Sequence, residues 1–210
     1  MGYDDAIRIQ ANNVTFEGLS VNALGGNIAV YGNGLGIFNC NLSIGLTVNG
    51  DGSQIAGNTV NGYLISAEGN NHAVIQNNIM GRVETKGCFN LIANNAVNSN
   101  GLDGTVSFVG NDTVVFNNTL TGSEEWIALN LEYGGKNNLV AKNHVVSGGV
   151  EVGAYSSYNT FCGNRLDGWG LSMMGFNNLF YANQLNHIGI GGTHGGTVDA
   201  AYNTFYLNNF

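Results

Sequence analysis

Four copies of one six-residue phrase decide the fold of this chain. They read N-L-V-A-K-N at Asn138–Asn143, N-T-F-C-G-N at Asn159–Asn164, N-L-F-Y-A-N at Asn178–Asn183 and N-T-F-Y-L-N at Asn203–Asn208. Degraded copies run back to the start, from N-V-T-F-E-G and G-L-G-I-F-N through S-Q-I-A-G-N, H-A-V-I-Q-N and N-L-I-A-N-N to D-T-V-V-F-N. A phrase that recurs along the whole chain indicates a repeat architecture.

The last residue of each phrase marks one repeat. Successive markers lie 18 to 26 residues apart, at Gly18, Asn39, Asn58, Asn77, Asn95, Asn117, Asn143, Asn164, Asn183 and Asn208. A second polar column precedes the markers by five residues, at Asn13, Ser53, His72, Asn90, Asp112, Asn138, Asn159, Asn178 and Asn203. Around both columns, apolar residues alternate with small or polar ones, which is typical of short strands.

This pattern predicts an all-β solenoid of parallel strands, with three short strands in each repeat and about ten coils. Asn and Gly suit the corners because they tolerate left-handed backbone. Stacked Asn amides can also hydrogen-bond from coil to coil, so we expect asparagine ladders. A leucine-rich repeat has a similar period, but the chain shows no helical stripe of apolar residues.

Composition excludes several other classes. The 210 residues include 33 Gly and no Pro, 43% are hydrophobic and 10% are charged. This is too apolar for a disordered chain and unlike collagen. The net charge of −8 argues against nucleic-acid binding. No apolar stretch has the length of a membrane span, and no signal peptide is evident. Three separated Cys residues form no CxxC motif, and we expect them to fill the core: Cys40, Cys88 and Cys162.

The phrase N-x-h-h-x-N-x-h, repeated from N-N-V-T-F-E-G-L to N-T-F-Y-L-N-N-F, resembles the right-handed parallel β-helix repeats of NosD-like and pectate-lyase-like proteins. Carbohydrate-binding and sugar-hydrolase domains of surface proteins carry similar repeats. The resemblance covers essentially all of residues 1–210 and implies one right-handed parallel β-helix domain. It also implies a secreted, periplasmic or cell-surface setting, with polysaccharide or another glycan as the commonest ligand class.

Charged residues gather on one predicted strand face. The strand after each marker has an outward position between two apolar ones, held by Thr47, Ser66, Glu84, Ser107, Asn130, Glu151 and Ser172. Two residues further on stand Asn49, Glu68, Lys86 and Glu132. Glu68, Arg82, Glu84 and Lys86 form the densest charged spot, and Glu132 and Glu151 a second acidic pair. Carboxylates on adjacent coils could hold Ca²⁺ or act as acid and base on a glycosidic bond.

A polysaccharide lyase of similar fold would need Ca²⁺ ligands and a basic residue that removes a proton from an acidic sugar. Lys86 or Arg82 would be the base, with Glu84 or Glu151 nearby and Glu68 and Glu84 as metal ligands. The acidic net charge would repel a polyuronate substrate. A hydrolase would need closely placed Asp residues, and the Asp residues of this chain are scattered.

Two insertions lengthen coils, at residues 121–127 and 191–199. The first places Trp126 near Tyr133, where an exposed indole could stack on a sugar ring. The second contains His194, which shares a coil with His187 as a candidate pair of metal ligands. We therefore expect a non-catalytic β-helix scaffold or carbohydrate-binding module that uses Trp126, Glu68, Glu132 and Tyr133.

Two alternatives stay open at this point. A polysaccharide lyase or glycoside hydrolase would use the same strand face. A structural element would stack end to end, since no polar cap is visible at either end of the repeats, and the chain would then be a segment of a longer protein or a self-associating unit.

Overall fold

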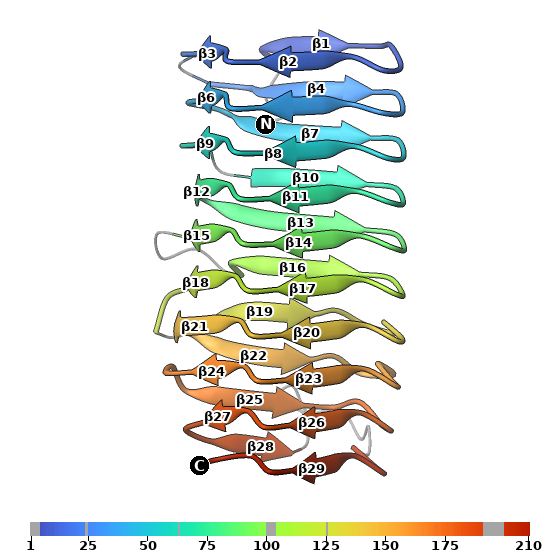
Figure 1. Cartoon of the computed structure of the whole chain (residues 1–210), viewed down its shortest axis with the longest axis vertical. Coiled ribbons are helices and arrows are strands. Elements are labelled where there is room, and N and C mark those ends of the chain that lie inside the picture. The colour runs from blue at the N-terminus through green and yellow to red at the C-terminus, as the bar shows by residue number, and fades with distance from the viewer. Residues whose placement is uncertain (1–4, 24, 63, 100–103, 125, 191–199) are drawn as a thin grey trace.

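The chain folds as an all-β parallel solenoid whose coils stack along one axis (Figure 1). The computed structural model describes residues 5–23, 25–62, 64–99, 104–124, 126–190 and 200–210. Within these ranges 29 short strands form three parallel sheets, and there is no helix. The absence of any helix in the described ranges agrees with the rejection of a leucine-rich repeat.

Each turn of the solenoid contributes one strand to each sheet. Sheet A contains β1 (Ile7–Ile9), β4 (Asn27–Tyr31), β7 (Gly45–Asn49), β10 (Leu64–Glu68), β13 (Arg82–Lys86), β16 (Val106–Val109), β19 (Ile127–Leu131), β22 (Gly149–Val152), β25 (Gly170–Met173) and β28 (Ile188–Ile190). Sheet B contains β2 (Thr15–Glu17), β5 (Gly36–Phe38), β8 (Gln54–Ala56), β11 (Ala73–Ile75), β14 (Leu91–Ala93), β17 (Val114–Phe116), β20 (Leu139–Ala141), β23 (Thr160–Cys162), β26 (Leu179–Tyr181) and β29 (Thr204–Tyr206).

Sheet C contains the shortest strands, which are β3 (Ser20–Val21), β6 (Asn41–Leu42), β9 (Thr59–Val60), β12 (Asn78–Met80), β15 (Ala96–Asn98), β18 (Thr119–Thr121), β21 (His144–Ser147), β24 (Arg165–Leu166) and β27 (Gln184–Leu185). The described residues thus form about nine complete turns, followed by β28 and β29. This agrees with the prediction of about ten coils.

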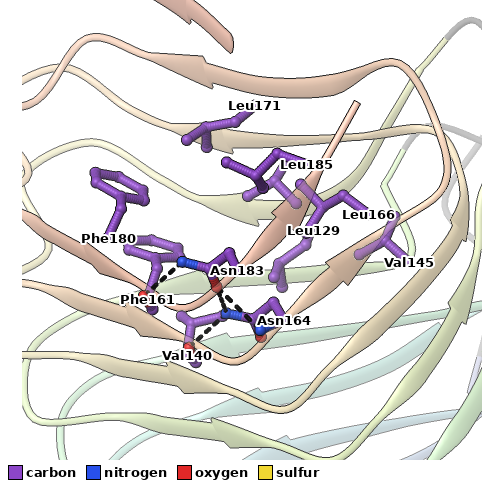
Figure 2. A pocket seen from close by; sticks show the side chains of 11 residues that line it. Leu129, Val140, Val145, Phe161, Asn164, Leu166, Leu171, Phe180, Asn183 and Leu185 are labelled. Atoms are coloured by element: carbon purple, nitrogen blue, oxygen red, sulfur yellow. Dashed lines mark hydrogen bonds between the residues drawn. The ribbon is translucent and has the colours of Figure 1, made fainter. Parts of the chain in front are cut away.

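The core is a column of stacked apolar side chains in the interior of the coils. In sheet A, Leu46 pairs in register with Ile65, and in sheet B, Ile55 pairs with Val74; all four are fully buried. Towards the C-terminal end the aliphatic column becomes a stack of Phe161, Phe180 and Phe205, with ring centroids 4.8 and 4.7 Å apart. Figure 2 shows the interior here, where apolar side chains surround the buried amides of Asn164 and Asn183. This interior space belongs to the core.

A continuous ladder of Asn amides holds the corner between sheets B and C. Asn77 is typical, because its Oδ1 accepts both the backbone N–H and the side-chain amide of Asn58, each at 2.9 Å. Its Nδ2 donates to the carbonyl of Ile55 at 2.8 Å and to Oδ1 of Asn95 at 3.0 Å. Every hydrogen-bonding capacity of the amide is therefore used. The predicted asparagine ladder is confirmed.

Three of the predicted markers were wrong by one residue. Gly18, Asn39 and Asn117 have left-handed backbone, with φ of 65°, 53° and 52°. The ladder position is the next residue, which is Leu19, Cys40 or Asn118. The corner consists of a left-handed residue followed by a ladder residue, and Asn suits both places, so a pair such as Asn117-Asn118 reads equally well in either register.

The second polar column contains the same error. Asn13 and Asp112 have φ of 56° and 55°, and the ladder positions in those coils are Val14 and Thr113. The expectation that Cys residues fill the core holds only for Cys40, since Cys88 and Cys162 are partly exposed. Cys162 ends β23, where its side chain points outward from sheet B, because the central residue of that strand, Phe161, is buried.

Candidate functional site

The outward row of sheet A is the one that the sequence predicts. Strand register places Thr47, Ser66, Glu84, Ser107, Asn130, Glu151 and Ser172 side by side on successive strands. Adjacent strands of a sheet lie about 4.8 Å apart, so neighbouring side chains in this row are within contact distance of each other.

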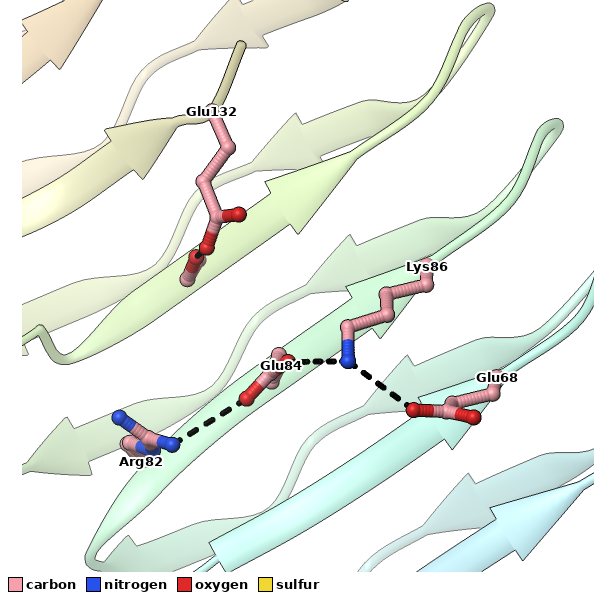
Figure 3. Close-up of polar contacts among 6 residues, drawn as sticks. Glu68, Arg82, Glu84, Lys86 and Glu132 are labelled. Carbon is pink, nitrogen blue, oxygen red and sulfur yellow. Dashed lines mark hydrogen bonds and ion pairs between the residues drawn. The ribbon is translucent and has the colours of Figure 1, made fainter. Parts of the chain in front are cut away.

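The charged spot in the N-terminal half of this face is a linear chain of ion pairs that runs from Glu68 through Lys86 and Glu84 to Arg82 (Figure 3). Nζ of Lys86 lies 3.0 Å from a carboxylate oxygen of Glu68 and 3.0 Å from one of Glu84. The other oxygen of Glu84 lies 3.2 Å from the guanidinium of Arg82. Each charged group already has an opposite charge as its partner within the protein.

This arrangement gives Lys86 the wrong properties for a base. The hydrogen bond to Glu68, and to a smaller extent the one to Glu84, raises the pKa of Lys86 above its ordinary value, because both carboxylates favour the ammonium form. A catalytic lysine base needs a lowered pKa. The geometry therefore argues against proton abstraction by Lys86.

The carboxylates predicted as metal ligands, Glu68 and Glu84, contact the same ammonium group. In the part of the chain that the structure describes, no three His, Cys, Asp or Glu side chains come together as metal ligands would. His187 is exposed just before β28, and His194 lies outside the described residues.

The second predicted acidic pair, Glu132 and Glu151, does not occupy one row. Glu151 pairs in register with Asn130, two residues before Glu132. The carboxylate of Glu132 turns to the preceding coil and accepts a hydrogen bond from the hydroxyl of Ser107. Glu151 instead lies between Asn130 and Ser172 on the outward side of strands β19, β22 and β25. These three residues are called the polar row below.

Two tryptophans flank one end of the polar row. Trp126 immediately precedes β19 and is 49% exposed, and Trp169 immediately precedes β25. Nε1–H of Trp169 donates to the carbonyl of Trp126 at 3.2 Å. The Trp169 ring covers Gly149, where a Cβ would meet the ring at 2.2 Å. Since Gly149 is two residues from Glu151 on the outward side of β22, an indole lies against the sheet directly beside the polar row.

Two tyrosines flank the opposite end of the same strands. Tyr133 follows β19, Tyr155 follows β22, and their side chains are 66% and 48% exposed. Their rings meet edge to face with centroids 4.9 Å apart. The prediction that Trp126 lies near Tyr133 is wrong, because β19 separates them and seven extended residues span about 20 Å. The two residues instead lie beyond opposite ends of β19. The polar row, together with the aromatic residues at both ends of its strands, is called the aromatic-flanked face below.

The polar row has hydrogen-bonding capacity that the protein leaves unused. Oδ1 of Asn130 and Oγ of Ser172 are buried and have no hydrogen-bond partner among the described residues. Ser172 is only 3% exposed. Buried polar atoms without partners are rare in proteins, and each one calls for an explanation. The row therefore combines unused polar groups with exposed aromatic rings on both sides.

A second polar cluster, which the sequence analysis missed, lies on the outward side of sheet C. The carboxylate of Asp167 accepts a hydrogen bond from Nε of Arg165 at 2.8 Å and lies 2.7 Å from Nε2 of His144. The hydrogen bond from Arg165, and to a smaller extent that with His144, lowers the pKa of Asp167. Strand register places His144 and Arg165 side by side on β21 and β24. Each follows a predicted marker by one residue, so the repeat alignment places these two residues in one column, but it does not show that the Asp167 side chain turns back to His144.

Sequence reasoning also missed Trp169, Gly149 and Tyr155. One signal was available, because Trp126 and Trp169 are the only two Trp residues of the chain and each directly precedes a strand of sheet A. The position of the Trp169 ring over Gly149 is a contact between coils that no spacing within one repeat predicts.

No helix in the described ranges has the length and apolar character that a membrane-spanning helix requires. No protein-family model matches the chain. The search of curated proteins likewise gives no significant match. Among solved structures, none matches significantly either. The parallel solenoid is therefore established by its own geometry, and the likeness to NosD-like and pectate-lyase-like repeats stays a resemblance of sequence pattern.

Proposed function

We propose that the protein is a non-catalytic glycan-binding β-helix whose binding surface is the aromatic-flanked face. The observation that carries the proposal is the polar row between two pairs of exposed aromatic side chains. Sugars bind proteins through the same combination, since their C–H faces pack on aromatic rings and their hydroxyls need amide, carboxylate and hydroxyl partners. In keeping with the resemblance to surface β-helix proteins, we place the protein outside the cytoplasm, in a secreted, periplasmic or cell-surface setting.

The negative charge of this face favours an uncharged glycan. Glu132 and Glu151 both lie on it, and the whole chain carries a net charge of −8. A polyuronate would meet repulsion here. A neutral β-linked glycan avoids this cost, and its flat rings match a surface about 20 Å long between the tryptophan and tyrosine edges.

A catalytic role on the same outward side of sheet A is the weaker alternative. Lys86 is held as an ammonium by two carboxylates, and its raised pKa is unfavourable for a base. Arg82 donates to Glu84 and is effectively always protonated. A lyase would therefore require a base other than Lys86 or Arg82.

The test is binding to cellulose, xylan and chitin, with polygalacturonate as the acidic comparison. We expect retention on at least one neutral polymer, a loss of at least tenfold in affinity for Trp169→Ala, and no change for Phe89→Ala. Phe89 is a suitable control because it is exposed in an earlier coil, between β13 and β14, two coils before Tyr133.

Two outcomes would overturn the proposal. Equal binding by Trp169→Ala and the unaltered protein would remove the aromatic-flanked face from recognition. Release of an unsaturated, ultraviolet-absorbing product that is lost in Lys86→Ala would instead establish the lyase.

A further inference from the structure

The indole of Trp169 lies with one face on strand β22. A Cβ added at Gly149 would meet three consecutive atoms of the six-membered ring, Cε2, Cζ2 and Cη2, at nearly equal distances. A Cβ opposite the edge of the ring would come close to only one of these atoms. The face of the indole therefore covers Gly149, and the side chain extends from the start of β25 across the preceding strand of sheet A.

A hydrogen bond at the ring edge holds the indole in this position. Nε1–H of Trp169 donates to the backbone carbonyl of Trp126, which precedes the next strand of the sheet, β19. Although Gly149 covers one face and this carbonyl one edge, Trp169 is still 36% exposed. The exposed area therefore belongs to the opposite face and the remaining edges of the ring.

Gly149 is required by the indole and not by the backbone. The neighbouring Gly148 and Gly170 have left-handed backbone, with φ of 84° and 111°, but Gly149 does not. Another residue could therefore adopt the backbone conformation at position 149, whereas its Cβ would lift the ring off the strand. The missing side chain at this position serves the placement of Trp169.

An indole held in this way suits the packing of a sugar. The C–H face of a pyranose can pack on the open face of the ring. Because Gly149 and the Trp126 carbonyl fix the ring before a ligand arrives, binding costs less conformational entropy. Glu151 lies two residues further along the outward side of β22, about 7 Å away, where its carboxylate can accept hydrogen bonds from sugar hydroxyls.

The same strand leads to a second aromatic contact. Tyr155 lies in the turn after β22, six residues beyond Gly149, and its ring packs edge to face on Tyr133. Six extended residues span about 20 Å. A β-linked glucan is an extended ribbon that can follow such a straight path, whereas an α-linked glucan coils and would leave it.

We propose that Gly149 is a positioning residue of the glycan site, which lets Trp169 lie flat as a preformed platform for one sugar of a β-linked chain that runs along β22 toward Tyr155. The inference rests on the glycan binding proposed above. It adds the residue that prepares the site and the direction in which the chain lies.

The test uses Trp126→Phe as the common background, which keeps the backbone carbonyl of residue 126 and leaves Trp169 as the only tryptophan. Added to this background, Gly149→Ala should shift the fluorescence emission of the free protein to longer wavelength, because the lifted indole contacts more water. It should also lower the affinity for cellohexaose at least tenfold. The background protein should bind maltohexaose, the α-linked counterpart, at least tenfold more weakly than cellohexaose.

Gly25→Ala is the matched control. Gly25 is exposed, its backbone is not left-handed, and a Cβ there would have no atom within 4 Å. This variant should change neither the emission nor the affinity. Circular dichroism checks that every variant is folded.

Three results would overturn the inference and leave the proposed function standing. Unchanged emission and affinity in Gly149→Ala would show that the glycine does not position the ring. A shifted emission with unchanged affinity would show that the sugar does not pack on the platform. Equal affinity for the two hexasaccharides would exclude the extended path along β22. Absence of binding to any neutral glycan by the unaltered protein would instead overturn the proposed function, and the inference with it.

Discussion

Two polar ladders run along opposite ends of the strands of sheet B, and they differ in continuity. The ladder between sheets B and C contains Asn in every coil from Asn58 to Asn208, through Asn77, Asn95, Asn118, Asn143, Asn164 and Asn183. The ladder between sheets A and B is continuous only from Asn138 to Asn203. Its earlier positions are Ser53, His72, Asn90 and Thr113.

The interruptions leave specific atoms without partners. His72 is 1% exposed, and its Nδ1 accepts the Ser53 N–H at 3.3 Å, longer than the amide bonds of the continuous ladder. Its Nε2 has no partner among the described residues. Oγ1 of Thr113 is likewise buried and unpaired within them. An Asn amide makes four hydrogen bonds at a corner, whereas an imidazole or a hydroxyl makes fewer.

The comparison shows what the abundant Asn does. It supplies the hydrogen bonds that a buried corner cannot obtain from water. Substitutions in the two ladders should therefore have opposite signs: removal of an amide from the continuous ladder destabilises the fold, and addition of an amide to the interrupted ladder stabilises it.

The largest effect is expected for Asn77→Ala. The change leaves the N–H of Asn58 and the carbonyl of Ile55 buried without their side-chain partners. We expect a loss of about 3 kcal/mol in the free energy of unfolding, measured by denaturant titration. Asn49→Ala, outside both ladders, is the control and should change the free energy by less than about 0.5 kcal/mol. A similar loss in both variants would contradict the ladder account.

His72→Asn should stabilise the protein by about 1 to 2 kcal/mol, because the new amide can extend the ladder and the unpaired Nε2 is removed. It should also change the response to pH. Burial lowers the pKa of His72 in the folded chain, so the unfolded chain takes up a proton first as the pH falls below about 6.5. The unaltered protein therefore loses stability below that pH.

The measurement is the unfolding midpoint between pH 7.5 and 5. The stability advantage of His72→Asn should grow as the pH falls through the ordinary histidine range. A constant difference between the two proteins at all pH values would show that His72 is not protonated on unfolding in this range.

A smaller gain is expected for Thr113→Asn. The new Oδ1 would face the backbone N–H of Asn90 in the preceding coil, as Asn138 Oδ1 now accepts the N–H of Thr113 at 2.8 Å. We expect a gain of about 1 kcal/mol in the free energy of unfolding. Thr113→Ala tests whether a gain comes from the amide, since it removes the unpaired hydroxyl and adds no hydrogen bond.

The smallest effect is expected at an exposed corner. Asp51 accepts the backbone N–H of Asn70 at 2.7 Å, and Asn33 accepts that of Asp51 at 2.8 Å. Water can replace these bonds, so Asp51→Ala should cost no more than about 0.5 kcal/mol. A loss comparable to that of Asn77→Ala would show that burial does not determine the importance of a ladder.

The sequence predicts the repeat, the ladders and the outward row because each depends on positions within one repeat. The sequence does not show whether Asn117 or Asn118 is the ladder residue, because Asn suits both positions of the corner. The ring of Trp169 over Gly149 and the contact of Asp167 with His144 join different coils, at sequence separations of 20 and 23 residues. Such contacts depend on coil length and side-chain direction, which a column of similar residues does not specify.

The ladders maintain the fold, and the aromatic-flanked face of sheet A is the surface that we propose binds glycan. The most direct test is the affinity of folded Trp169→Ala and folded Asn77→Ala for cellohexaose, measured by calorimetry beside the unaltered protein. We predict that Trp169→Ala binds at least tenfold more weakly, while Asn77→Ala retains its affinity despite its lower stability. Equal affinity of Trp169→Ala and the unaltered protein, or no binding by the unaltered protein, would contradict the account.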